Sequence, residues 1–143
     1  MNDRSFLDTN IFLYSFDLRF PSKAARANEL IRQAHASGNG VVSFQVVQEF
    51  FNVALKKSST KMPYDGAQRY LAEVLGPLVA VQSTQELYAV AIRLYDRYRF
   101  SWYDSVIVAA AMEAGCSVLL TEDLQDSMQV EGLRIENPFK DFD

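Results

Sequence analysis

The strongest constraint on the fold is a regular alternation of short apolar segments with longer helical ones. Segments of strand length occur at Ser5–Leu7, Val41–Val42, Leu78–Val81, Val118–Leu120 and Leu133–Ile135. Strands that alternate with helices are typical of βαβ units, in which the strands lie parallel. The pattern therefore predicts an α/β domain with a mainly parallel central sheet of four to five strands.

The helical stretches between these strands carry recognisable boundaries. Ser43 can cap the helix that follows the second strand, and Ser83 begins a capping-box pattern with Glu86. One stretch, Val106–Met112, is apolar nearly all round, which indicates a central, buried helix. The expected helices cover residues 10–17, 21–37, 45–57, 63–76, 85–99 and 101–114.

Length and composition favour one folded domain over residues 1–143. The chain has 143 residues with 6 Gly and 4 Pro, too few of either for a linker-rich chain. The longest apolar run, Val106–Met112, is far too short to span a membrane. Asp8 interrupts the first apolar segment too early for a signal peptide. We therefore expect neither secretion nor membrane insertion.

The rarity of cysteine and histidine excludes several kinds of chemistry. Cys116 is the one cysteine and His35 the one histidine, so an internal disulfide, a cysteine-built zinc site and a multi-histidine metal site are all excluded. This usage is typical of a reducing, cytoplasmic setting. The net charge of −4 excludes a uniformly basic surface for binding nucleic acid. It does not exclude a local basic stripe or an acidic site filled by a metal ion.

Four acidic residues stand where strands end or helices begin. Asp8 follows the first strand, Asp123 follows the fourth, and Glu49 and Asp104 lie near the starts of two helices. Because the carboxyl ends of parallel strands meet at one sheet edge, these side chains can converge. Clustered carboxylates repel one another, and a hard cation such as Mg²⁺ or Mn²⁺ removes that cost. Such a site suits metal-assisted hydrolysis of a phosphodiester.

Taken singly, each acid also has a purely structural interpretation. Asp8 can cap the first helix, and Asp104 forms a capping box with Ser101. Asp123 can begin a helical turn, and Glu49 can lie on the surface. The catalytic interpretation therefore depends on all four together.

Four segments, taken in order and spacing, resemble the PIN domain, in particular the small VapC-like toxins of bacterial type II toxin–antitoxin pairs. The resemblance extends from Ser5 to about Pro138, and no single motif is specific. The segments are Phe6–Asn10, Gln48–Phe50, Ser101–Ser105 and Leu119–Leu124.

This resemblance implies a three-layer α/β/α fold and a Mg²⁺- or Mn²⁺-dependent ribonuclease that acts on RNA. It implies a homodimer that a cognate antitoxin protein holds inactive by inserting a segment near the active site. Asp8 and Asp104 would be the main metal ligands, and Glu49 and Asp123 would complete the site directly or through water. The supporting polar residues would be Thr9, Asn10 and Thr121.

Two rival functions follow from the same residues. A phosphotransferase of the haloacid-dehalogenase type needs a second aspartate two residues after Asp8, where Asn10 stands, and a lysine near a later strand end, which Val118–Thr121 does not supply. The other rival is a degenerate or metal-binding PIN fold that acts by protein contact without nuclease activity. The presence of all four acids argues against that alternative.

Basic and aromatic residues leave further alternatives open. Lys56, Lys57 and Lys61 form one basic cluster, and Arg93, Arg97 and Arg99 form another; each is either a solvated face or a contact for phosphates. Trp102 is expected in the core or in a groove, with stacking on RNA as the less favoured interpretation. The aromatic residues that could serve a dimer or antitoxin interface are Phe12, Tyr14 and Phe16.

Overall fold

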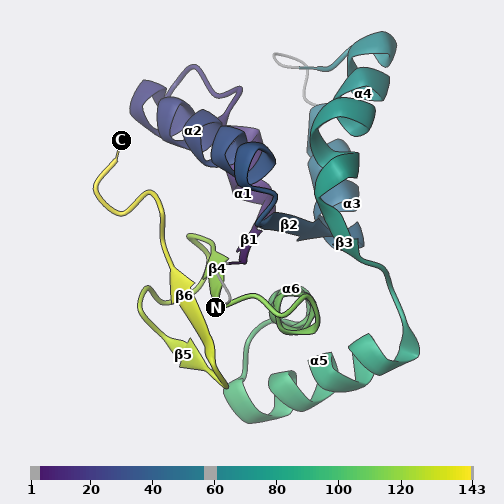
Figure 1. Ribbon diagram of the computed structural model, residues 1–143, viewed down its shortest axis with the longest axis vertical. Helices are drawn as coiled ribbons and strands as arrows, with labels where there is room; N and C mark the ends of the chain where they lie inside the picture. The colour runs from purple at the N-terminus through teal and green to yellow at the C-terminus, as the bar shows by residue number, and fades with distance from the viewer. Residues whose placement is uncertain (1–3, 57–60, 143) are drawn as a thin grey trace.

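The computed structural model describes residues 4–56 and 61–142, which form a six-stranded sheet between two layers of helices (Figure 1). The strand order is β3-β2-β1-β4-β6-β5, and every neighbouring pair except β5–β6 is parallel. The three-layer α/β/α class with a mainly parallel sheet is therefore confirmed. The strands are β1 Ser5–Leu7, β2 Gly40–Ser43, β3 Val79–Val81, β4 Val118–Leu120, β5 Gln129–Val130 and β6 Leu133–Glu136.

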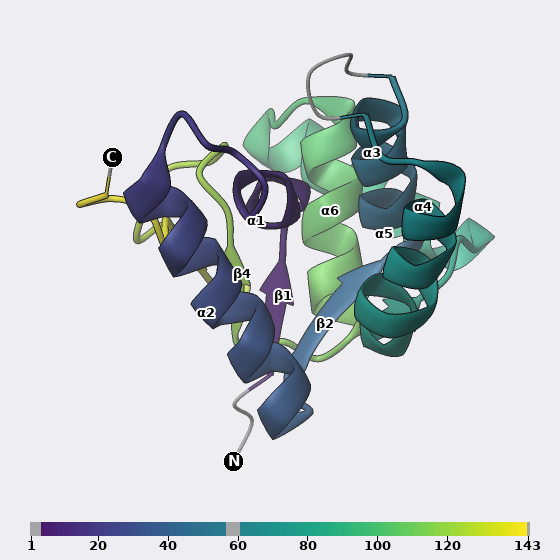
Figure 2. The same ribbon diagram turned by 90° about the horizontal axis from the view of Figure 1, so that it is seen from above.

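The helices α1 to α4 lie on one side of the sheet, and α5 and α6 lie on the other (Figure 1). Viewed from above, the arrowheads of β1 and β2 point to the same edge, and α1 lies at the end of β1 (Figure 2). This edge therefore carries the first residues after the parallel strands. The helices are α1 Thr9–Tyr14, α2 Pro21–Ser37, α3 Phe44–Ala54, α4 Tyr64–Tyr70, α5 Gln85–Tyr98 and α6 Trp102–Glu113.

The sixth strand, β5, has no counterpart among the strands expected from the sequence. It is two residues long and pairs antiparallel with β6 through a tight turn. Glu131 and Gly132 in that turn have positive φ angles of 50° and 93°, as a type I′ hairpin turn requires. So short a strand carries no alternating pattern of apolar and polar residues. The predicted number of strands, four to five, is therefore lower than the six in the structure.

Three helices end earlier than the sequence pattern predicts, and one of them, α3, stops at Ala54 instead of residue 57. The first stops at Tyr14 instead of residue 17, because Asp17 accepts hydrogen bonds from the backbone and guanidinium of Arg19 and stabilises a turn there. The fourth stops at Tyr70, and the chain continues in a π-helical turn, Leu71–Leu75, and a short 3-10 turn. Gly76 permits the wide turn, because a Cβ atom there would lie 2.7 Å from the Leu71 carbonyl oxygen.

The expected capping residues behave differently from one another. Ser43 precedes α3 but its side chain makes no capping hydrogen bond, and its hydroxyl is buried without a partner. At α5 the cap is Thr84, one residue after the expected Ser83, and its hydroxyl accepts from the backbone N–H of Leu87 at 3.1 Å. Ser101 caps α6 as expected.

The core lies on both faces of the sheet and has α6 at its centre. As predicted, every residue of α6 from Val106 to Ala111 is buried, and so are Val46, Phe50 and Ala54 of α3. Phe12 is also fully buried, so its expected role at an interface is wrong. No helix in the described part of the chain is both long and apolar enough to cross a membrane.

Candidate active site

Asp8 lies at the carboxyl end of β1, the strand from which the chain adds β2 on one side and β4 on the other. Strand β1 lies between β2 and β4, and ligands of open parallel sheets bind outside such a switch point. Leu7 pairs with Leu120, so Asp8 and Thr121 leave neighbouring strands side by side. The Asp8 carboxylate is only 5% exposed and accepts two hydrogen bonds of 2.7 Å, from the Thr9 backbone N–H and the Thr121 hydroxyl.

Glu49 reaches the same place from α3. The Thr9 hydroxyl donates to its Oε1 at 2.7 Å, and the Gln45 amide donates to its Oε2 at 3.1 Å. Gln45 lies one helical turn before Glu49, so both side chains share a face of α3. Thr9 thus contacts both acids, through its backbone to Asp8 and through its side chain to Glu49. The surface interpretation of Glu49 is wrong, because its side chain is half-buried and held by two donors.

Asp104 and Asp123 complete the cluster from the other side. Asp104 lies in the first turn of α6, where its backbone N–H donates to the Ser101 hydroxyl at 3.1 Å. Asp123 is exposed in the loop after β4, and its carboxylate accepts from the Asn10 amide at 3.2 and 3.3 Å. No helix starts at Asp123, so the expected helical turn there is wrong.

The electrostatics show that the four carboxylates lie close enough to affect one another. Burial, opposed by the hydrogen bonds from Thr121 and Thr9, raises the pKa of Asp8 to about 6, and the charges of Asp123 and Glu49 add to the rise. Burial also raises the pKa of Asp104, and the charge of Glu49 raises it further. For Asp123, burial and then the charge of Asp104 raise the pKa. The convergence predicted from the sequence is present in the structure.

The four acids supply the kind of ligand atom that a divalent cation prefers, but their side chains are not gathered around one position. Carboxylate oxygens are the donors that Mg²⁺ and Mn²⁺ prefer, and the mutual repulsion of the acids is the cost that such a cation removes. Among residues 4–56 and 61–142, however, no three histidine, cysteine or acidic side chains are grouped tightly enough to hold a metal ion as they stand. The donor set therefore fits such an ion, and the side chains would have to move closer together to hold one.

Comparison with protein families identifies the fold. The model of the PIN domain matches residues 5–126, most of the chain. The chain belongs to the PIN domain family. A search of curated proteins finds no match.

Solved structures share this PIN fold at low sequence identity. A toxin-antitoxin complex from Klebsiella pneumoniae is 20% identical with a TM-score of 0.66, over 94% of this chain and 97% of that one. VapBC2 from Rickettsia felis, bound to a promoter DNA fragment, is 17% identical with a TM-score of 0.63, over 93% and 97%. VapC20 of Mycobacterium tuberculosis, a Sarcin-Ricin loop cleaving toxin, is 18% identical with a TM-score of 0.56, over 83% and 91%.

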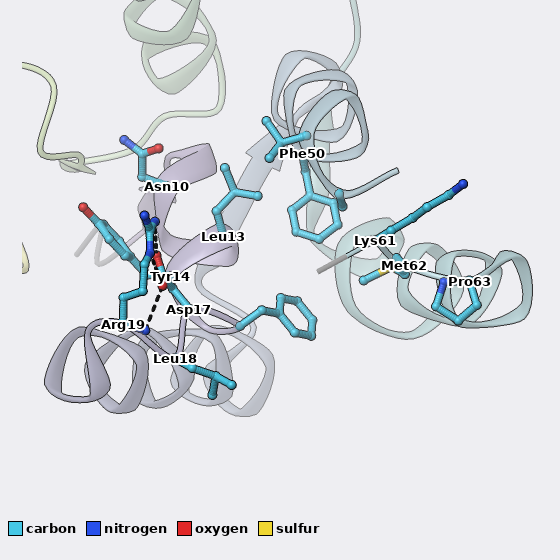
Figure 3. Close-up of a pocket in the computed structure, with 13 residues that line it drawn as sticks. Asn10, Leu13, Tyr14, Asp17, Leu18, Arg19, Phe50, Lys61, Met62 and Pro63 are labelled. Atoms are coloured by element: carbon cyan, nitrogen blue, oxygen red, sulfur yellow. Dashed lines mark hydrogen bonds and ion pairs between the residues drawn. The ribbon is translucent and has the colours of Figure 1, made fainter. Parts of the chain in front are cut away.

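A groove opens beside the acids of this PIN domain. It has a volume of about 700 Å³ and is lined by α1, the loop after it, α3 and residues 61–63 (Figure 3). Asn10 lines the groove and also holds Asp123, so the groove and the acidic cluster share a boundary. Leu13, Leu18 and Phe50 give the groove an apolar lining, and Leu18 is 91% exposed. The groove is therefore suited to an apolar segment of a partner.

Two features of the site have no clear signal in the sequence. Gln45 donates to both the Glu49 carboxylate and the backbone carbonyl of Tyr103, each at 3.1 Å, and so joins α3 to α6. Glu122, the neighbour of Asp123, accepts from the Tyr14 hydroxyl and forms an ion pair of 3.5 Å with Lys23. The sequence does contain one weak indication: Gln45 and Glu49 are spaced i, i+4, which places both side chains on the same face of a helix.

The basic clusters have partners of their own. Lys56 donates to the Asn52 side chain at 2.7 Å, and Arg93 forms an ion pair of 2.7 Å with Glu131. Lys61 lines the groove, and Arg97 lies over the ring of Tyr98. Lys57 lies outside the described residues. For Lys56 and Arg93, these contacts fit a solvated face better than a contact for RNA phosphates.

Proposed function

We propose that this PIN domain is a Mg²⁺- or Mn²⁺-dependent endoribonuclease that hydrolyses RNA phosphodiester bonds. The observation that supports the proposal is the convergence of four carboxylates at the switch point of the sheet, with Asp8 buried among them. Burial raises the pKa of Asp8 to about 6 despite the hydrogen bonds from Thr121 and Thr9, so the protein alone compensates the ionised form only in part. A bound cation supplies the remaining compensation.

Each side chain then has a distinct task. Asp8 and Asp104 would be the main ligands of the cation, and Glu49 and Asp123 would complete the set directly or through water. A divalent cation bound there polarises a phosphate and lowers the pKa of a water molecule. Thr9 and Thr121 hold the carboxylates of Glu49 and Asp8 in position. Asn10 does the same for Asp123.

We further propose that the chain is the toxin of a type II toxin–antitoxin pair, that residues 1–143 form a single domain, and that it acts in the cytoplasm as a homodimer. Support comes from its likeness in fold to proteins of toxin–antitoxin systems, including the complex from Klebsiella pneumoniae. That likeness extends over nearly the whole of each chain. A chain with this role slows growth when it is expressed without its partner.

The apolar groove beside the acids is the proposed docking place of the antitoxin. A segment with apolar side chains would lie in the groove between the loop after α1 and residues 61–63 (Figure 3). At the Asn10 end such a segment reaches the acidic cluster, where a cationic side chain would be favoured by the four negative charges. Binding there would close access to the site. Leu18→Glu would weaken the pairing, because it places a charge on the apolar wall of the groove.

The proposal is tested with purified protein and total bacterial RNA. We expect cleavage with Mg²⁺ or Mn²⁺, none with EDTA, and a loss of at least about 100-fold in Asp104→Asn. Expression of the parent without an antitoxin should arrest growth, and expression of Asp104→Asn should not. Cleavage that persists in EDTA, or in a folded Asp104→Asn protein at the parent rate, contradicts the proposal.

The second candidate is a PIN fold that acts by protein contact. It is favoured by one observation, that no three acidic side chains in the described ranges are already grouped to hold a metal ion. In that case Asp104→Asn would retain partner binding and biological effect, and the parent would not cleave RNA under any metal condition.

A further inference from the structure

A largely buried group of polar side chains next to the acidic cluster takes no part in the chemistry proposed above. The Tyr14 hydroxyl donates a hydrogen bond to Oε1 of Glu122, and the Lys23 ammonium donates to that hydroxyl at 3.3 Å. Lys23 also forms an ion pair of 3.5 Å with Oε2 of Glu122, and their side chains are 19% and 22% exposed. Charged side chains are seldom so well covered unless they are paired. We call Tyr14, Lys23 and Glu122 the polar anchor.

Three aromatic rings fix the position of the ammonium group in the polar anchor. The Lys23 nitrogen lies 4.7 Å from the centre of the Tyr14 ring. It lies 5.4 Å from the centre of the Phe20 ring and 6.0 Å from that of Phe139, which is itself buried. A cation within about 6 Å of a ring centre is attracted by the face of the ring. Lys23 would therefore lose three ring contacts as well as its ion pair if it moved away from Glu122.

The polar anchor joins α1 and α2 to the loop that carries Asp123. This loop, residues 121–128, is described in full and contains no helix or strand. Glu122 contacts Tyr14, and the next residue, Asp123, accepts from the amide of Asn10. Asn10 and Tyr14 are one turn apart on α1, so their side chains lie on the same face of that helix. Two successive residues of the loop are thus bound to one face of α1.

Charge separates the task of Glu122 from that of its neighbour Asp123. Burial, then the charge of Asp104 and then that of Glu122 raise the pKa of Asp123, so the Glu122 carboxylate lies near the acidic cluster. Both of its oxygens, however, already have partners, Tyr14 on one and Lys23 on the other. A carboxylate bound in this way is poorly available to a cation, but it is well placed to fix the backbone on either side of it.

We propose that Tyr14, Lys23 and Glu122 are positioning residues, which hold the loop after β4 so that the Asp123 carboxylate faces the other three acids. None of them would contact the cation or the substrate. The inference rests on the proposed function for the task of Asp123, but the order of the loop can be measured without metal or RNA.

The order of the loop is measured first, by amide nitrogen relaxation in NMR of the full-length protein in EDTA. Glu122→Ala removes both contacts of the polar anchor with the loop. Order parameters of residues 122–124 should be near the rigid value of about 0.85 in the parent and below about 0.6 in this variant. Tyr14→Phe removes the hydroxyl but keeps the ring and every charge, and its values should lie in between. If Glu122→Ala does not fold, Tyr14→Phe carries the test.

The same proteins are then titrated with Mn²⁺ while water proton relaxation is followed. Loss of a contact to a metal ligand typically lowers metal affinity 10- to 100-fold, and the polar anchor acts one step farther out. Glu122→Ala should therefore bind Mn²⁺ about three- to tenfold more weakly than the parent. Tyr14→Phe should also bind more weakly, and because it changes no charge, its loss cannot come from electrostatics. A merely structural role would lower the melting temperature and leave the affinity unchanged.

Tyr98→Phe is the matched control, because the chain contains a second group of the same three kinds of side chain. The Tyr98 hydroxyl donates to Glu131 at 3.3 Å, and Glu131 forms an ion pair with Arg93. Glu131 lies in the turn before β6, and β6 runs parallel to β4, so this group lies at the sheet edge opposite to Asp123. The control should change neither the order of the loop nor the affinity for Mn²⁺.

The outcomes distinguish this inference from the proposed function. A loop that loses order in Tyr14→Phe and Glu122→Ala, but not in Tyr98→Phe, supports the positioning role. If the parent in that case binds no Mn²⁺, the proposed metal site is contradicted and the positioning of the loop stands. A loop as ordered in the two variants as in the parent overturns the inference, whether or not the parent binds Mn²⁺. Equal Mn²⁺ affinity of Glu122→Ala and a parent that binds the ion overturns it as well, and leaves the metal site standing.

Discussion

The two halves of the acidic cluster are built differently. On one side, Asp8 and Glu49 are fixed, and the shortest bonds to their carboxylates, from Thr9 and Thr121, are 2.7 Å long. On the other side, Asp123 is exposed and is held by bonds of 3.2 and 3.3 Å from Asn10. We call Asp8 and Glu49 the fixed pair, and Asp104 and Asp123 the open pair.

The difference suggests how one site can be both pre-organised and able to close. In the proposed function the fixed pair would set the position of the cation, at the cost of burying a carboxylate in the protein without metal. The open pair lies on a helix start and on a loop, where side chains can move with little loss of packing. This division is consistent with the lack of a tight three-acid group among the described residues.

The largest expected effect comes from neutralising one acid in each pair. Asp8→Asn and Asp104→Asn should each lower ribonuclease activity by about 100- to 1000-fold or more, because each removes a charge needed to hold the cation. Initial rates on total RNA measure the loss. The two differ in stability: at pH 7.5 without metal, Asp8→Asn should melt at a higher temperature than the parent, and Asp104→Asn should gain less. Activity within tenfold of the parent in a folded Asp8→Asn protein would count against the comparison.

The second effect is a pH dependence of stability that comes from Asp8. Its pKa is raised by burial from 3.8 to about 6 in the folded protein, so the proton binds the native state more tightly than the unfolded one. The stabilisation by protonated Asp8 is complete below about pH 4 and is lost as the pH rises through about 6. Two pKa units correspond to about 3 kcal/mol. Asp8→Asn, which does not titrate, should therefore be more stable than the parent by up to about 3 kcal/mol at pH 7.5.

Urea unfolding of the parent and Asp8→Asn at several pH values measures this difference. Comparing the two proteins at each pH cancels the contribution of the acids that do not interact with Asp8. The difference in unfolding free energy between the two proteins should stay constant above about pH 6.5, narrow as the pH falls through about 6, and level off near pH 4. A difference in unfolding free energy that does not change with pH would show that burial does not raise the pKa of Asp8.

A smaller effect is expected from the hydroxyls that hold the fixed pair. Thr121→Val removes the donor to Asp8, and Thr9→Val removes the donor to Glu49, while both keep the shape of the side chain. Loss of such supporting contacts typically lowers metal affinity 10- to 100-fold. Calorimetric titration with Mn²⁺ gives the affinity directly. Affinities equal to that of the parent would mean that these hydrogen bonds do not orient the ligands.

The smallest effect is expected from the support of the open pair. Asn10→Ala removes two long hydrogen bonds to an exposed carboxylate, so metal affinity should fall less than tenfold. The same titration, run beside Thr121→Val, ranks the two halves of the site. If Asn10→Ala costs as much as Thr121→Val, the distinction between fixed and open pairs fails.

The sequence predicts the meeting of the four acids better than it predicts the details around them. Asp8 comes directly after β1 and Asp123 lies in the loop after β4, and sheet topology alone brings strand ends together. Strand β5 and the π-helical turn at Leu71–Leu75 were missed, because the first is too short for a pattern and the second depends on how Gly76 packs against Leu71. The double role of Gln45 depends on the tertiary contact of α3 with α6, which no spacing reveals.

The central claim, that these carboxylates hold a divalent cation, is tested most directly by titrating the purified protein with Mn²⁺ and following water proton relaxation. The parent, Asp8→Asn and Asp104→Asn are compared, each checked for folding. We predict saturable binding in the parent that is lost in both variants. If all three titrate alike, the four acids do not form a metal site, and their convergence must be explained by helix capping and protein contact instead.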